Sequence, residues 1–145
     1  MLFGGLAMAP DIDLLFGAHS GPTHSLGATA FVAAAALLLQ RRMRWLPGVT
    51  DLQPAVFVLA CAAAYSSHVL LDWLATDSRP PIGIMALWPL NRDHYESDWH
   101  IFMAISRRYH QGWSFIRHNA LALAWEMILL LPALLLVMMF RHRRT

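Results

Sequence analysis

The stretch Leu52 to Leu71, LQPAVFVLACAAAYSSHVLL, decides the fold class. It carries no Asp, Glu, Lys or Arg, and it is about as long as a helix must be to cross the hydrocarbon core of a bilayer. A similar apolar stretch lies on each side of it along the chain, and each of these ends in a cluster of arginines. The sequence therefore predicts an all-α fold, a small polytopic membrane helical bundle, with about three transmembrane helices at roughly 24–40, 52–72 and 120–140.

The composition fits a single membrane-embedded domain covering residues 1–145. Of these residues 57% are hydrophobic and only 14% are charged, whereas a soluble domain has about 25% charged residues. A polar, aromatic-rich segment, 77–118, separates the second and third stretches and is expected to form a loop that carries short helices. This composition excludes an ordinary soluble enzyme and a disordered chain.

Charge and cysteine content limit the partners. Eleven basic residues against nine acidic ones give a net charge of +2, which is too small an excess to indicate nucleic-acid binding. Cys61 is the single cysteine, so neither an intramolecular disulfide nor a disulfide-linked partner is expected. The first nine residues are apolar but have no basic region before them, and no cleavable signal peptide is predicted.

Arginines predict the orientation in the membrane. By the positive-inside rule, the arginine clusters after the first and third spans lie on the cytoplasmic side. Three spans place both clusters on the same side, so the segment before the first span and the loop after the second share the opposite face. The clusters are Arg41, Arg42 and Arg44, and Arg141, Arg143 and Arg144.

Acidic residues and histidines gather at that opposite face. A hairpin of two antiparallel helices brings together the residues before the first span and those at the end of the second. Ionisable groups at the edge of the apolar zone are costly and usually mark a functional site. The residues concerned are Asp11, Asp13, His19, His24, His68 and Asp72.

His68 and Asp72 are spaced i, i+4, so both project from one face if the second span is helical. An imidazole and a carboxylate at this spacing can bind the same divalent cation, and the alternative is a capping or hydrogen-bonded pair. Glu126, inside the third span, is expected either to face the metal site or an arginine, as a ligand or supporting group, or to be hydrated near the interface.

The segment Pro10-Asp11-Ile12-Asp13 predicts a turn or a short extended piece. In an extended piece the two carboxylates point the same way, whereas in a turn one can bind a metal while the other orients a histidine. Either could instead cap a helix that follows. His19 and His24 then flank a Gly-Pro turn, and Thr23 or Ser25 is expected to cap the first span.

Three blocks in this order, PDID at 10–13, HSGPTHS at 19–25 and SHVLLDW at 67–73, resemble the YdjM-like (LexA-regulated) family of membrane-bound metal-dependent hydrolases. That family is distantly similar to zinc-dependent phospholipase C and the P1-type nucleases. The resemblance implies a bacterial inner-membrane protein, and the arginine clusters then predict that its motif side lies in the periplasm. It also implies a Zn²⁺ site formed by Asp13, His24, His68 and Asp72, with His19 as a further candidate ligand.

The resemblance further implies an activity. A metal-activated water would attack a phosphoester or other lipid-linked substrate at the membrane surface, with Asp11 and Asp13 as catalytic carboxylates and membrane lipid as the partner. In the family, a helix with a further histidine precedes the PDID block, where this chain has nine residues without one. This difference favours the alternative function, a non-catalytic divalent-metal-binding membrane protein with a sensing, transport or structural role.

Overall fold

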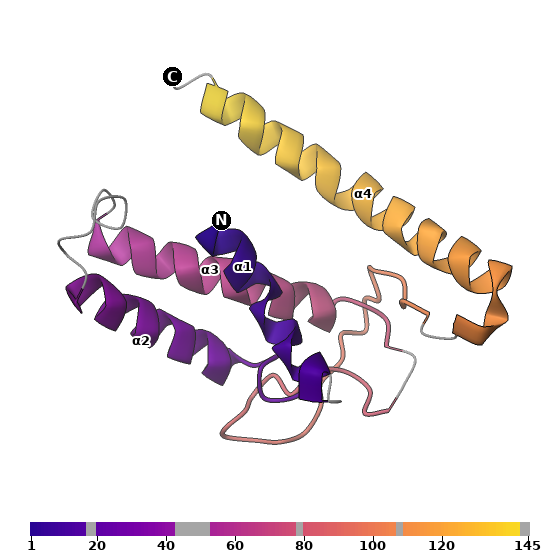
Figure 1. Ribbon diagram of the computed structural model, residues 1–145, viewed down its shortest axis with the longest axis horizontal. Helices are drawn as coiled ribbons and strands as arrows, with labels where there is room; N and C mark the ends of the chain where they lie inside the picture. The colour runs from indigo at the N-terminus through magenta and orange to yellow at the C-terminus, as the bar shows by residue number, and fades with distance from the viewer. Residues whose placement is uncertain (17–19, 43–52, 78–79, 107–108, 143–145) are drawn as a thin grey trace. The chain divides into compact units, whose positions relative to one another are not determined.

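The computed structural model describes residues 1–16, 20–42, 53–77, 80–106 and 109–142, and these contain only helices and connecting segments. Figure 1 shows the ribbon. The chain divides into two compact units, Met1–Trp99 and His100–Thr145. The elements in chain order are α1 (Leu2–Met8), the 3₁₀ helix η1 (Ala9–Phe16), α2 (Leu26–Arg42), α3 (Pro54–Trp73), the 3₁₀ helix η2 (Tyr109–Gln111) and α4 (Trp113–His142).

The all-α prediction is confirmed for the described residues, since each of the three apolar stretches forms a helix. Two of these helices, α3 and α4, are long and apolar enough to cross a membrane. At 17 residues, α2 is shorter than the about 20 residues of a typical span. Within the described ranges, two helices therefore qualify as candidate spans by length, where the sequence predicted about three.

The beginning of the chain differs from the sequence prediction. Residues before the PDID block form the short helix α1, which was not predicted. The block itself lies in the 3₁₀ helix η1, which agrees with the predicted turn and not with the predicted extended piece. Both elements pack on α3, and the Phe3 and Phe57 rings lie 6.5 Å apart between their centroids. This packing between distant parts of the chain is not visible in local sequence patterns.

Helix ends in the first unit follow from local chemistry. The Ser25 hydroxyl accepts a hydrogen bond from the Ala28 amide at 3.0 Å, which makes Ser25 the N-cap of α2 and confirms one of the two predicted caps. Pro54 occupies the first turn of α3, where its missing N–H costs nothing. Gly27 packs directly on the backbone of Trp88, and a Cβ there would collide with the carbonyl oxygen of that residue.

One stripe of α3 forms the core of the first unit. Phe57, Cys61, Tyr65 and Val69 are all buried and recur every fourth residue, so they line a single helix face. Helix α2 packs along α3, and Ala36 joins Phe57 and Cys61 in one cluster of buried residues. His68 and Asp72 lie at the C-terminal end of α3, beyond this apolar stripe.

In the second unit, polar side chains of α4 hold the irregular segment 101–106. Nε2 of His118 donates to the Ala104 carbonyl at 2.7 Å, and the Trp125 indole donates to the Ile101 carbonyl at 2.8 Å. The Asn119 amide bonds both backbone groups of Ser106. These contacts supply the irregular backbone with hydrogen-bond partners that lipid cannot provide. Helix α4 itself begins at Trp113, whereas the sequence predicted a span from about residue 120.

Candidate metal centre

Helix α3 contributes an imidazole and a carboxylate to the candidate site. His68 Nε2 and Asp72 Oδ2 lie 3.5 Å apart, as the i, i+4 spacing predicted. Nδ1 of His68 lies 2.8 Å from the Ala7 carbonyl oxygen. Because a carbonyl can only accept, Nδ1 carries a proton, and Nε2 faces the carboxylates of Asp72 and Asp11.

The turn before α2 contributes His24, whose side chain is completely buried. Two contacts from distant parts of the chain hold this turn. The Tyr65 hydroxyl on α3 donates to the Thr23 carbonyl at 2.6 Å, and the Met85 amide donates to the Ser20 carbonyl at 3.0 Å. As a result, Nε2 of His24 lies 3.1 Å from Oδ2 of Asp72.

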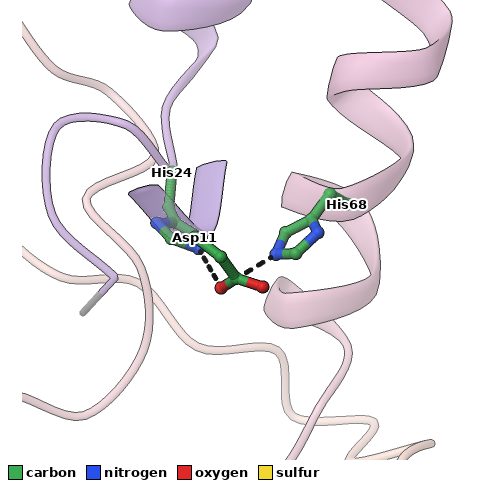
Figure 2. Close-up of side chains that lie close together, drawn as sticks. All are labelled: Asp11, His24 and His68. Carbon is green, nitrogen blue, oxygen red and sulfur yellow. Dashed lines mark ion pairs between the residues drawn. The ribbon is translucent and has the colours of Figure 1, made fainter. Parts of the chain in front are cut away.

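The two aspartates of η1 reach different sides of the His24 ring. A 3₁₀ helix has three residues per turn, so residues two apart project in different directions. Asp13 Oδ2 lies 3.1 Å from Nδ1 of His24 and accepts hydrogen bonds from the Thr23 hydroxyl at 3.0 Å and the Gly21 amide at 3.3 Å. Asp11 Oδ1 instead faces the Nε2 side, 3.8 Å from His24 and 3.5 Å from His68 (Figure 2).

Four side chains therefore converge on one point, namely Asp11, His24, His68 and Asp72. One donor atom each from Asp11, His24 and His68 can be chosen so that all three lie within 4.8 Å of one another. Among the residues that the structure describes, His68 Nε2 and Asp72 Oδ2 are buried without a hydrogen-bond partner. Buried polar atoms are rarely left without a partner, so either the ion pairs among these side chains or a bound cation satisfies them.

The cluster is closed on one side and open on the other. The exposed fraction of the side chain rises from 0% for His24 through 18% for His68 and 27% for Asp72 to 41% for Asp11. Water and small ligands would therefore reach the convergent atoms from the side of Asp11.

Five of the predicted site residues come together in the first unit: Asp11, Asp13, His24, His68 and Asp72. His19 lies outside the described residues. Glu126 is half-buried on α4 in the second unit, and its proposed role as a ligand stays a prediction.

Sequence reasoning missed the groups that hold the two histidines. Tyr65 lies three residues before His68 and seven before Asp72, on the same side of α3, and this helical spacing was a readable signal. The Ala7 carbonyl gave no such signal, because its contact with His68 depends on the packing of α1. Thr23 was considered only as a helix cap, yet its hydroxyl bonds Asp13.

The apolar helices and the buried cluster define a small helical membrane protein with a candidate cation site. The chain belongs to the YdjM inner membrane protein family, whose pattern matches residues 1–144. Neither the curated proteins nor the solved structures contain a match. The expected similarity to phospholipase C and the P1-type nucleases therefore stays a prediction.

Proposed function

We propose that this protein is a membrane-bound, zinc-dependent hydrolase that acts on a phosphoester of a membrane lipid or lipid-linked compound. One observation carries the proposal. Two imidazole Nε2 atoms and two carboxylates converge, while each Nδ1 lies against an oxygen that fixes the ring. Histidines that bind metals usually donate their second ring N–H to a carbonyl or carboxylate in this way.

The donor set suits Zn²⁺, which prefers four ligands drawn from His nitrogen, Cys sulfur and carboxylate oxygen. In the hydrolase, three residues would hold it, His24, His68 and Asp72, which leaves the fourth position for water with Asp11 beside it. The family resemblance implied that Asp13 is a ligand. In this assignment Asp13 is instead a positioning residue that fixes the ring of His24.

The chemistry follows from the cluster and its open side. When bound, Zn²⁺ supplies a Lewis acid that acidifies water and stabilises the negative charge developing on a phosphoryl group. Asp11, at the opening, is the carboxylate placed to accept a proton from an incoming water. Asp13 holds the proton on Nδ1 of His24 and so keeps Nε2 turned toward the site.

The location of the cluster favours a substrate in the membrane. Asp72 lies in the last turn of α3, so the cluster lies at one end of a helix able to cross the bilayer. Helix α2 begins two residues after His24 and ends at Arg41 and Arg42. By the positive-inside rule those arginines are cytoplasmic, and we place the cluster on the periplasmic side of a multi-pass protein.

A second candidate function is binding of a divalent metal without catalysis, in a sensing, transport or structural role. The observation that favours it is the number of protein donors. Two imidazoles and two carboxylates are enough to complete a tetrahedral shell, which is typical of structural zinc sites. In that case no position would remain for a reacting water.

Metal analysis of the purified protein tests the proposal. The full chain in detergent, His68→Ala, Asp72→Ala and the control His110→Ala, which changes an exposed histidine outside the cluster, would be assayed for bound metal by mass spectrometry. We expect stoichiometric zinc in the parent and control and a loss in the two site variants. Metal near zero in all four proteins would sink both candidate functions.

Substrate assays then separate the two functions. Vesicles of phosphatidic acid or phosphatidylglycerol would be incubated with the zinc-loaded protein, and released phosphate or alcohol would be measured. Release by the parent and not by His68→Ala supports the hydrolase. Bound zinc without any release leaves the non-catalytic function.

A further inference from the structure

The 3₁₀ helix η1 buries one of its two aspartates and exposes all of its large apolar side chains. Pro10 and Asp13, one 3₁₀ turn apart, are its buried residues. Leu15 and Phe16 are 80% and 82% exposed, and two other large side chains of the same segment, Ile12 and Leu14, are exposed as well. A segment in water would show the opposite arrangement, and contiguous exposed apolar side chains mark protein or membrane contacts.

Contacts with α3 fix the depth of η1 in the bilayer. Asp11 lies 3.5 Å from His68, and the carbonyl of Ala7, two residues before η1, lies 2.8 Å from the same ring. His68 is five residues from the end of α3 at Trp73, which is about 8 Å along a helix axis. If α3 spans a hydrocarbon core about 30 Å thick, η1 therefore lies near its boundary, and Trp73 suits that interface.

We propose that the apolar edge of η1, formed by Ile12, Leu14, Leu15 and Phe16, inserts into the lipid leaflet that surrounds the C-terminal end of α3. Two observations favour lipid over water around this edge. Its four large apolar side chains are exposed, and the ion pair between Asp11 and His68 holds η1 at the end of a candidate span. The partner is thus the bilayer itself, at the level where headgroups meet acyl chains.

This placement narrows the substrate class of the proposed hydrolase, a step that rests on the proposed function. Asp11 directly precedes the apolar edge and is the most exposed member of the cluster. The open side of the cluster therefore adjoins lipid. A substrate would reach it laterally, as an amphiphile whose acyl chains stay in the leaflet while its phosphoester enters the cation site beside Asp11.

Spin labels on η1 test the insertion without any activity measurement. Leu15→Cys and Phe16→Cys would be labelled in the full chain and reconstituted in phosphatidylethanolamine and phosphatidylglycerol vesicles, where buried Cys61 provides the background labelling to subtract. Collision with oxygen, which concentrates in lipid, would be compared with collision with a water-soluble nickel chelate. Leu59→Cys, exposed within α3, is the lipid reference, and Arg92→Cys, exposed in a polar loop, is the water reference.

We expect the two η1 labels to match Leu59→Cys, with oxygen collisions several-fold more frequent relative to nickel than at Arg92→Cys. Labels on η1 that collide mainly with nickel would place the segment in water. Labels shielded from both reagents would place it against protein. Either result overturns the proposal. Zinc content measured on the same samples separates the two ideas. Bound zinc with a water-exposed η1 refutes only the insertion, whereas a lipid-exposed η1 without zinc refutes only the metal site.

Discussion

Replacing Asp13 by asparagine should weaken metal binding without removing it. Asp13 is 6% exposed, and its Oδ2 lies close to three donors: the Gly21 amide, the Thr23 hydroxyl and Nδ1 of His24. Asparagine keeps the shape and one acceptor oxygen but loses the negative charge. The variant therefore isolates the charge that faces the His24 ring from the side opposite the proposed metal.

The size of the effect follows from the hydrogen bond to His24. A hydrogen bond to a charged group contributes about 1.5–3 kcal/mol, and one between neutral groups about 0.5–1.5 kcal/mol. The bond from Nδ1 should thus weaken by about 1–2 kcal/mol, a factor of roughly 5–30 in an equilibrium constant. Residues that support metal-binding histidines typically contribute about 10–100-fold to affinity, and the two estimates overlap.

Competition for Zn²⁺ with a chromophoric chelator measures this effect in detergent. Asp93→Asn is the matched control, because Asp93 is exposed and bonds Asn91 in a loop away from the cluster. His68→Ala supplies the limit of a lost ligand, and far-ultraviolet circular dichroism verifies that each variant is folded. If Asp13→Asn binds zinc as tightly as Asp93→Asn, the positioning role is refuted. If a folded Asp13→Asn loses zinc as completely as His68→Ala, Asp13 is a direct ligand.

Three further predictions concern stability, each read from thermal unfolding in detergent. Tyr65→Phe leaves the Thr23 carbonyl without its donor and should lower the free energy of unfolding by about 1–3 kcal/mol. Ser67→Ala, on the exposed side of α3, should lower it by less than about 0.5 kcal/mol, and equal effects of the two changes would contradict a stabilising role for the Tyr65 hydrogen bond. Gly27→Ala should destabilise the protein by about 1–3 kcal/mol because its methyl group would meet the backbone of Trp88. Gly4→Ala is the control, since its methyl group would meet open space. An unchanged unfolding midpoint for Gly27→Ala would refute the close packing. A chelator should lower the unfolding midpoint of the parent and leave that of His68→Ala unchanged, and a parent that is indifferent to the chelator argues against bound metal.

The helices of this protein were largely predictable because their signals are local. The three apolar stretches became α2, α3 and α4, and Ser25 caps α2 as its position before an apolar stretch suggested. The boundaries of α4 were less predictable, since its first residues form a helix that binds the segment 101–106 through side chains. That segment gives no local sign of where its backbone groups are bonded.

The conformation of the PDID block was not determined by its own sequence. Proline and aspartate allow both a turn and an extended piece, and packing of α1 and η1 on α3 selects the 3₁₀ helix. An extended piece would have turned both carboxylates to one side. The 3₁₀ helix separates them, and this decides which aspartate faces Nε2 and which faces Nδ1 of His24.

The sequence by itself determined that this protein belongs in a membrane, where its helices lie and that His68 pairs with Asp72. These features depend on hydrophobicity and helical period, which act over neighbouring residues. The sequence also predicted that His24 would lie near this pair, but tertiary structure alone decided which of its ring nitrogens meets Asp72 and that the Ala7 carbonyl and Asp13 fix the two rings. These contacts join residues far apart in the chain. Their geometry depends on how α1, η1 and the turn before α2 pack around the end of α3, which no local pattern specifies.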